Sequence, residues 1–298
     1  MKVLLTGAAG QLGWEMQRTV PQGVTLLAMD SAGLDITDAA AVRSLVAEER
    51  PRVIVNAAAR TAVDRAESEP ERARLVNGLG AANLAEAARE QDAFLVQLST
   101  DFVFDGKSSR PYGPADTPAP LGVYGASKLD GEVAVQRISG ERSAIVRTSW
   151  LYSSHGHNFV KTMLRLMEER NEVRVVADQI GTPTWAGGLA AAVWQIAGRT
   201  LPGIHHWSDG GVASWYDFAV AIQEEGMSLG LLGRAIPVLP ITTAEYPAQA
   251  RRPSYSVLDK TATWALLGGP APHWRVQLRR MLHEYRGQRD EAKWQQGS

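Results

Sequence analysis

Short apolar runs recur through the first half of the chain, and each is followed by turn residues or by a helical pattern. The runs are residues 2–6, 24–28, 52–56, 93–98 and 143–147. They are close to continuous, which is typical of strands that are buried on both faces of a sheet. Because helical signals such as those of residues 70–90 separate the strands, we predict right-handed crossovers and a parallel sheet covered on both faces. The predicted fold class is α/β, a doubly wound parallel sheet.

The second half alternates less regularly, and we expect a smaller α/β domain that is interleaved with returns to the sheet. The expected division is residues 1–150 for the sheet domain, with returns near 173–200 and 237–250, and residues 151–298 mainly for the second domain. Apolar residues at helical spacing between Trp274 and Tyr285 predict a C-terminal amphipathic helix. Residues 286–298 are polar, and we expect a frayed tail there.

The first apolar run ends in a glycine-rich turn that a helical pattern follows. Glycine allows a tight turn and a close backbone approach, while the free amides at the start of the next helix attract an anion. We therefore expect the turn to bind a dinucleotide pyrophosphate, with a plain helix start as the alternative reading. The expected contacts are Gly7, Gly10, Gln11, Leu12 and Gly13.

Asp30 closes the second apolar run, where an acidic residue can bind the ribose hydroxyls of the adenosine. A carboxylate there repels a 2′-phosphate, so we expect NADH to be used at least as well as NADPH. A solvated loop aspartate is the alternative. Small residues after the third run let a flat cofactor approach the sheet edge. The other expected cofactor contacts are Asp35, Ile36, Ala58, Ala59, Arg60 and Thr61.

The stretch from Ser99 to Lys128 carries the candidate chemistry. Thr100 follows the fourth apolar run, and Tyr124 and Lys128 are spaced four apart. On a helix they share one face, where the cation is expected to lower the pKa of the phenol and make Tyr124 a usable proton donor. The alternative is that the two side chains share a solvated helix face.

Composition narrows the classes of partner. The net charge is −1, with 31 basic and 32 acidic residues and no long block of one sign, which argues against nucleic acid and a membrane surface as partners. There is no cysteine, which excludes disulfides and thiolate catalysis. The run before Gly7 is too short for a signal peptide, and no later run could span a bilayer, so we expect a cytoplasmic protein. The spacings of the histidines match no metal-ligand motif.

Taken together, these motifs resemble the extended short-chain dehydrogenase/reductase superfamily, and within it the dTDP-4-dehydrorhamnose reductases. The resemblance extends from Met1 to about Tyr285 and implies a Rossmann-like fold with a smaller, interleaved sugar-nucleotide domain. It rests on GAAGQLG at 7–13, NAAA at 56–59, STDFVFDG at 99–106, Tyr124 with Lys128, and the segments 147–152, 158–160, 178–184, 214–219 and 252–259.

The resemblance implies reduction of the C4 ketone of dTDP-4-dehydro-L-rhamnose to dTDP-L-rhamnose by NADH or NADPH. Tyr124 is then the proton donor, Lys128 holds the nicotinamide ribose, and Thr100 hydrogen-bonds the carbonyl. Trp150 and Phe159 offer apolar faces to the substrate; the alternative is that they pack in the core. Two arginines offer positive charge for the substrate pyrophosphate. The alternative for the arginines is a solvated turn. The expected substrate contacts are Thr100, Asp101, Trp150, Asn158, Phe159, Arg251 and Arg252.

Three other functions stay open at this point. A reductase that makes the C4 epimer, dTDP-6-deoxy-L-talose, could carry the same Thr, Tyr and Lys. A sugar-nucleotide dehydratase or epimerase shares the fold, but a dehydratase typically needs a second acid after Asp101, and Phe102 stands there. A non-catalytic regulatory subunit, such as that of methionine adenosyltransferase, is the third.

The resembled family can also bind Mg²⁺ through glutamates at a dimer contact. Glu15 could match one of these ligands, but its companions cannot be placed in the sequence. A homodimer therefore stays open, and we expect no metal in the active site.

Overall fold

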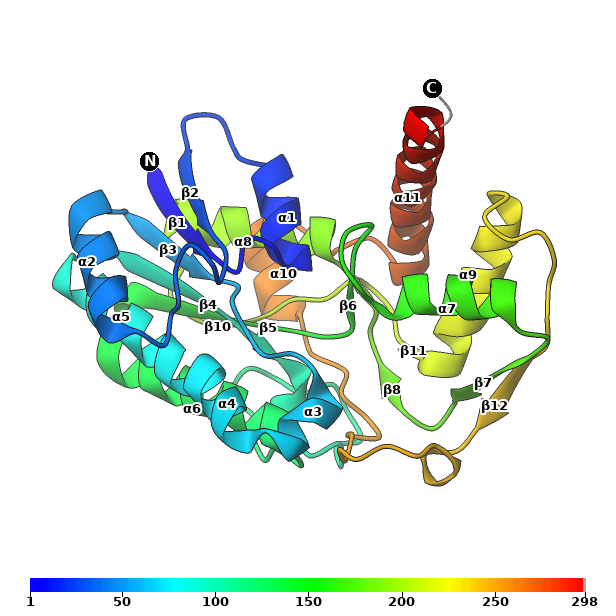
Figure 1. Cartoon of the computed structure of the whole chain (residues 1–298). Helices are drawn as coiled ribbons and strands as arrows, with labels where there is room; N and C mark the ends of the chain where they lie inside the picture. Colours follow the sequence, from blue (N-terminus) through cyan, green and yellow to red (C-terminus); the bar gives the residue numbers. More distant parts are fainter. Residues whose placement is uncertain (297–298) are drawn as a thin grey trace.

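The computed structural model describes residues 1–296, with side chains described through Glu291, and its centre is a six-stranded sheet (Figure 1). All neighbouring strands are parallel, in the order β10-β5-β4-β3-β1-β2. This confirms the predicted doubly wound α/β fold. The strands are β1 (Lys2–Thr6), β2 (Thr25–Met29), β3 (Val53–Asn56), β4 (Phe94–Thr100), β5 (Ser143–Thr148) and β10 (Gly203–His206).

Alternate residues of the central strands pack into two separate cores. Val3 and Leu5 of β1 face the core under α1 (Gln11–Arg18) and α8 (Ala186–Arg199). Leu4 faces the opposite core, whose helices are α2 (Ala39–Glu49), α5 (Gly80–Glu90) and α6 (Val123–Ser139). Because side chains on a strand point to opposite faces in turn, a continuous apolar run fits a strand covered on both sides.

The helix predicted over residues 70–90 is present but is not regular. It consists of α4 (Pro70–Arg74), a π-helical turn η1 (Leu75–Leu79) and α5, after a short helix α3 (Val63–Ser68). The π-helical turn buries Asn77. Its side-chain oxygen accepts a hydrogen bond from the backbone N–H of Arg60 at 2.8 Å, and its side-chain nitrogen donates to the Arg60 carbonyl at 3.1 Å and to the Ser127 hydroxyl at 2.9 Å. One side chain thereby ties the segment after β3 to α6.

The second domain surrounds its own apolar core on one side of the sheet (Figure 1). It contains α7 (Phe159–Glu169), α9 (Trp215–Ser228) and the first part of α11 (Trp274–Gln296). Its short strand pairs are β7 (Val173–Val176) with β12 (Val238–Ile241), β8 (Ile180–Gly181) with β11 (Ala213–Ser214), and β6 (Leu151–Tyr152) with β9 (Thr184–Trp185).

The expected returns to the sheet are only partly right. Helix α8 does return to the main sheet, and so do β10 and α10 (Thr261–Leu267). Strands β7 and β12 pair with each other instead, because the side chains of Val173 and Val175 are buried in the core of the second domain. The expectation that 237–250 rejoins the sheet is therefore wrong.

The frayed tail expected from residue 286 is also wrong, since α11 continues to Gln296; residues 297–298 lie outside the described residues. Polar contacts with other parts of the chain hold this end of the helix. The Gln288 amide donates to the Ser154 hydroxyl at 3.0 Å, and Arg289 pairs with Glu168 of α7 at 3.5 Å. Nothing in the described part of the chain is a helix long and apolar enough to cross a membrane.

A buried ion pair joins α6 to β5. Arg147 donates two hydrogen bonds to the carboxylate of Glu132, at 2.9 and 2.6 Å, and the two side chains are each 2% exposed. The guanidinium also lies over the Phe104 ring and 3.4 Å from a ring nitrogen of His206. Burial and the charge of Arg147 lower the pKa of His206 to about 3, so this imidazole is neutral at physiological pH.

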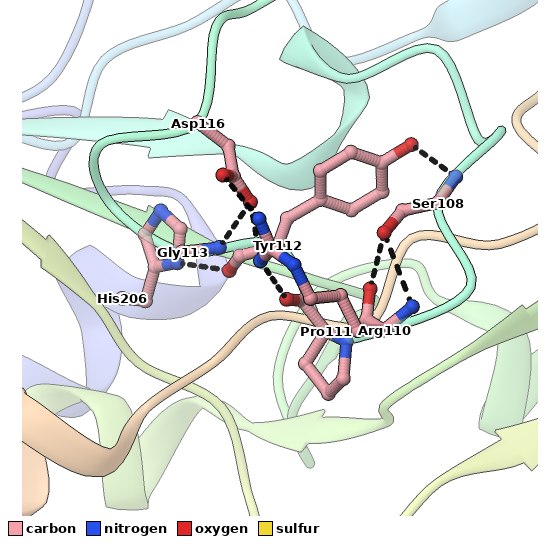
Figure 2. Close-up of polar contacts among 7 residues, drawn as sticks. All are labelled: Ser108, Arg110, Pro111, Tyr112, Gly113, Asp116 and His206. Carbon is pink, nitrogen blue, oxygen red and sulfur yellow. Dashed lines mark hydrogen bonds and ion pairs between the residues drawn. The ribbon is translucent and has the colours of Figure 1, made fainter.

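His206 extends the same network into the loop that precedes α6 (Figure 2). Its Nδ1 donates to the backbone carbonyl of Tyr112 at 3.0 Å. Within the loop, Arg110 forms a two-point ion pair with Asp116, and Asp116 also accepts a bond from the amide of Gly113. A stretch rich in Gly, Pro and Ser is thus held in one conformation by side chains.

We expect Glu132→Ala to lower the free energy of unfolding by about 3–5 kcal/mol, because it leaves the Arg147 charge buried without a partner. Urea denaturation at neutral pH measures the change. The matched control is Glu169→Ala, which removes the exposed pair with Arg165 and is expected to cost less than about 0.5 kcal/mol. Similar small losses for both variants would contradict this account of the α6 contact.

Candidate active site

Two adjoining cavities lie at the carboxyl ends of the sheet strands, where ligands of parallel sheets bind. One of about 470 Å³ is lined by Thr100, Tyr124 and Lys128. The other, of about 660 Å³, is lined by Asp30 and Arg60. Their walls share Gly10, Ala57 and Ala59, so they form one elongated cleft past the glycine turn.

Most of the predicted residues line this cleft. The first cavity holds Gly10, Gln11, Leu12, Gly13, Ala59, Thr61, Thr100, Asp101, Tyr124, Lys128, Trp150 and Arg252. The second holds Gly7, Gly10, Asp30, Asp35, Ile36, Ala58, Ala59 and Arg60. Among the described residues, the predicted contacts that line neither cavity are Asn158, Phe159 and Arg251.

The glycine turn has the shape that its sequence requires. Gly7 has a φ of +75°, and a Cβ there would lie 2.5 Å from the amide nitrogen of Ala58. A Cβ on Gly13 would lie 2.3 Å from the carbonyl oxygen of Gly7. The turn is therefore packed between β3 and α1, and the first amides of α1 open toward the cleft as an anion site.

Charges of both signs surround the second cavity. Asp30 follows β2, and its Oδ1 accepts bonds from the amides of Ala32 and Gly33 at 3.0 and 2.9 Å. Arg60 and Arg72 line the same cavity. Arg72 was not among the sequence predictions, because nothing in its position on the polar helix 70–74 pointed to the cofactor.

Tyr124 and Lys128 lie on α6 beside Thr100, which ends β4. The amide of Val123 donates to Glu67 Oε1 at 2.8 Å, which caps the start of α6 and fixes the turn that carries Tyr124. The Lys128 ammonium donates to the carbonyl of Leu98 at 2.6 Å. The alternative, in which the two side chains share a solvated helix face, is wrong because Lys128 is only 3% exposed.

A row of buried polar side chains ends at the same carbonyl. Thr6 donates to Asn56 at 2.7 Å, Asn56 donates to Gln97 at 2.8 Å, and Gln97 donates to the Leu98 carbonyl at 2.8 Å. These residues cross β1, β3 and β4 in register. Sequence reasoning missed them, although polar residues within buried apolar runs were a usable signal.

The expected lowering of the Tyr124 pKa is wrong for this structure. Burial raises the pKa of Tyr124 to about 12, and the charge of Asp101 adds to the rise while a bond with Thr100 opposes it. Burial also lowers the pKa of Lys128 to about 8, against the opposing charge of Glu132. Desolvation disfavours the charged form of both groups, so Tyr124 keeps its proton at neutral pH.

Asp101 is a buried carboxyl group in the wall of the first cavity. Burial raises its pKa to about 7, although bonds with Ser256 and Thr100 oppose the rise. Its Oδ1 accepts a bond from the Thr100 hydroxyl at 3.1 Å, and its Oδ2 has no hydrogen-bond partner among the described residues. The side chain is 2% exposed and lies in position to meet a polar group of a ligand.

An aromatic pair forms the opposite wall. Trp150 has a φ of +45° and stacks on Trp215 with ring centroids 3.6 Å apart and planes within 7°. Gly181 makes room for it, since a Cβ there would lie 2.6 Å from the indole. Trp215 was not predicted as a site residue, although it lies within the resembled segment 214–219.

The other predicted substrate contacts have different partners. Phe159 packs on Trp215 and Phe218 in the second core, so its alternative reading as a core residue is right. Arg252 lines the cavity edge and pairs with Asp64 at 2.7 Å. Arg251 is exposed outside the cleft.

Glu15 does not have the setting of a surface metal ligand. It is 2% exposed, accepts a bond from the Ser153 hydroxyl at 2.8 Å, and lies 3.4 Å from Arg18. Among the side chains that the structure describes, residues 1–291, no group of three or more His, Asp or Glu is arranged to hold a metal ion.

The pKa of Asp101 predicts a specific pH dependence of stability. The unfolded carboxyl ionises near 3.8, whereas the native one keeps its proton to about 7. Between these values the unfolded state binds fewer protons, so rising pH destabilises the native state, and above about pH 7 the effect is constant. We expect Asp101→Asn to gain stability relative to wild type from about pH 4 to about pH 7, by at most about 1.4 kcal/mol per unit. Urea denaturation across this range would refute it by showing a constant difference.

Comparison with known proteins identifies the family of the chain. Residues 1–287 match the family described as the RmlD substrate binding domain. The chain is 43% identical to the spore coat polysaccharide biosynthesis protein SpsK of Bacillus subtilis, over 95% of this chain and 97% of that protein. It is 43% identical to the dTDP-4-dehydrorhamnose reductase of Aggregatibacter actinomycetemcomitans, over 93% and 97% of the two chains.

A solved structure extends the similarity to three dimensions. The dTDP-4-dehydrorhamnose reductase of Bacillus anthracis in complex with NADP is 40% identical and superposes with a TM-score of 0.89, over 95% of this chain and 99% of that one. Sequence and fold thus point to the same group of proteins. The chain therefore belongs to the RmlD substrate binding domain family, and its relatives include proteins named dTDP-4-dehydrorhamnose reductase.

Proposed function

We propose that this chain is an NAD(P)H-dependent oxidoreductase that reduces the C4 ketone of dTDP-4-dehydro-L-rhamnose to dTDP-L-rhamnose. One observation carries the proposal: the buried Thr100 and Lys128 and the half-buried Tyr124 line a cavity that continues into a glycine turn at a helix N-terminus. Relatives at about 40% identity carry the reductase name. SpsK adds support for a role in making surface polysaccharide.

We assign the parts of the dinucleotide to positions along the cleft. The first amides of α1 attract its pyrophosphate, and Asp30 lies where the adenosine ribose is expected. The bound dinucleotide supplies the hydride, and the protein supplies orientation and electrostatics. Lys128, in the wall of the first cavity, is assigned to the nicotinamide ribose.

Tyr124 acts as the acid of the reduction. Negative charge builds on the C4 oxygen as hydride reaches the carbon, and a donor must be in place at that moment. A pKa of about 12 keeps the proton on Tyr124 until an alkoxide forms, and an alkoxide is basic enough to take it. Lys128, with a pKa of about 8, is still largely cationic at neutral pH and stabilises the tyrosinate that remains. Thr100 hydrogen-bonds the same oxygen.

The remaining residues of the cavity are assigned to the sugar nucleotide. Asp101 contacts the sugar, Trp150 and Trp215 offer it an apolar face, and Arg252 faces its pyrophosphate. The two-domain division, with residues 1–150 for the dinucleotide and 151–298 mainly for the sugar nucleotide, is part of the proposal. A cytoplasmic location fits an enzyme that consumes NADPH or NADH, and a homodimer stays a prediction.

Simple reduction is favoured over the dehydratase alternative by the residue after Asp101. Phe102 occupies the position of the second acid, and its ring packs edge-on against Tyr124 with centroids 5.8 Å apart. The catalytic constellation also argues against a purely regulatory protein, because a binding module has no need of a buried lysine and a tyrosine in the wall of a cofactor cleft.

Tyr124→Phe is expected to lower kcat by about two to four orders of magnitude, because it removes the proton donor and leaves the ring packing intact. NADH oxidation at 340 nm with the keto sugar nucleotide measures the rate. The Kd for NADPH, measured by fluorescence titration, is expected to stay within about threefold of wild type. Near-native turnover by the variant would refute the assignment.

The charge of Asp30 is expected to determine the choice of cofactor. We expect wild type to use NADH at least as well as NADPH by kcat/KM, because the Asp30 carboxylate repels a 2′-phosphate. Asp30→Ala is expected to shift the ratio toward NADPH by about tenfold or more, since Arg60 and Arg72 line the same cavity and the Asp30 charge no longer repels the 2′-phosphate. A strong wild-type preference for NADPH would contradict this reading of Asp30.

A further inference from the structure

One stripe of α1 contacts the second domain along its whole length. Gln11 and Glu15 are four apart, and so are Trp14 and Arg18; the two pairs lie side by side on one face of the helix. Their partners are, in the same order, Asn158, His155, Ser153 and Glu284. Three of these partners lie in residues 153–158, the segment between β6 and α7.

The contacts at the N-terminal end of the stripe are buried and specific. Asn158 Nδ2 donates to Gln11 Oε1 at 3.0 Å and to the Ser153 carbonyl at 2.7 Å. The Ser153 hydroxyl donates to Glu15 Oε1 at 2.8 Å. Asn158, Ser153 and Glu15 are all buried. Residues 153–158 are thus bonded to α1 and to themselves.

The outer contacts are aromatic and ionic. The Trp14 and His155 rings are stacked, with centroids 5.1 Å apart and planes within 7°. A ring nitrogen of His155 lies 3.1 Å from the carbonyl oxygen of Ala9, inside the glycine turn. Arg18 lies over Trp14, 4.2 Å from the ring, and pairs with Glu284 of α11.

These contacts connect the two ends of the cleft. Gln11 begins α1 at the glycine turn, and Asn158 caps α7 through a bond from the amide of Lys161 at 3.1 Å. The next residue, Phe159, packs on Trp215, which stacks on Trp150 in the wall of the first cavity. A continuous series of contacts therefore runs from the pyrophosphate turn to the aromatic wall.

We propose that Gln11, Glu15, Ser153 and Asn158 are positioning residues that couple dinucleotide binding at the glycine turn to the ordering of residues 153–158 and of the aromatic wall. The inference rests on the proposed function for the identity of the two ligands. Coupling of this kind is reciprocal, so each ligand tightens the binding of the other by the same factor. The proposal also gives Glu15 a role within one chain, in place of the metal contact that the resemblance implied.

Hydrogen exchange with NADP⁺ alone tests the first step. We expect the amides of residues 153–158 to exchange at least about fivefold more slowly with NADP⁺ in wild type. Asn158→Ser keeps a helix-capping hydroxyl but lacks the donor to Gln11, and we expect it to lose this protection. The control is Arg165→Gln, on the exposed face of α7, which keeps it. Equal protection in Asn158→Ser and wild type, or none in wild type, would overturn the proposal.

Calorimetric titration of dTDP tests the second step. In wild type we expect saturating NADP⁺ to lower the Kd for dTDP by about tenfold. Ser153→Ala and Glu15→Leu are expected to reduce that factor to about one to two, while Glu15→Gln retains an acceptor for Ser153 and retains the factor. An unchanged factor in Ser153→Ala and Glu15→Leu would contradict the proposal.

The two arms also separate this inference from the proposed function. If the chain does not act on dTDP sugars, dTDP fails to bind while the NADP⁺ exchange experiment still decides whether the glycine turn orders residues 153–158. If the reductase assignment is right and the coupling is wrong, turnover is normal and both ligands bind independently of one another.

Discussion

The position of α6 against the sheet is the constraint on which the site depends. This helix carries Tyr124 and Lys128, and the Glu132–Arg147 pair holds it to β5, the strand beside the one that ends in Thr100. Arg147 also reaches His206 of β10, which holds the loop before α6 through Tyr112. Because Glu132 lies one helical turn beyond Lys128, the same pair that fixes the helix also places a negative charge near the lysine.

Burial at this helix determines the protonation states of the site. Tyr124 stays protonated, Lys128 stays largely charged near pH 7, and Asp101 titrates near neutrality. In the proposed reduction the proton leaves only when an alkoxide forms, and a phenol whose pKa is raised to about 12 meets that need. In that proposal Lys128 acts on the tyrosinate left after transfer, which is later in the reaction than the sequence-based expectation of an acidified tyrosine placed it.

Local patterns account for what the sequence could predict. The strands follow from continuous apolar runs, the turn from closely packed glycines, and the candidate catalytic group from Thr100 at the end of a strand and Tyr124 with Lys128 in the first turns of a helix. The π-helical turn at Asn77 and the row from Thr6 to Gln97 depend on partners in neighbouring elements. Arg252 is an example at longer range, since its partner Asp64 lies 188 residues away in the chain. The helical tail likewise depends on polar contacts with α7 and with Ser154 that composition does not reveal.

The NMR spectrum of the product tests the central claim most directly. The enzyme is incubated with dTDP-4-dehydro-L-rhamnose and NADPH or NADH, and the sugar nucleotide is isolated. The account predicts dTDP-L-rhamnose, with an equatorial 4-hydroxyl shown by large H3–H4 and H4–H5 couplings, and one reduced cofactor consumed per product. An axial 4-hydroxyl, the 6-deoxy-L-talose product, would contradict it, and so would a product formed without net oxidation of the cofactor.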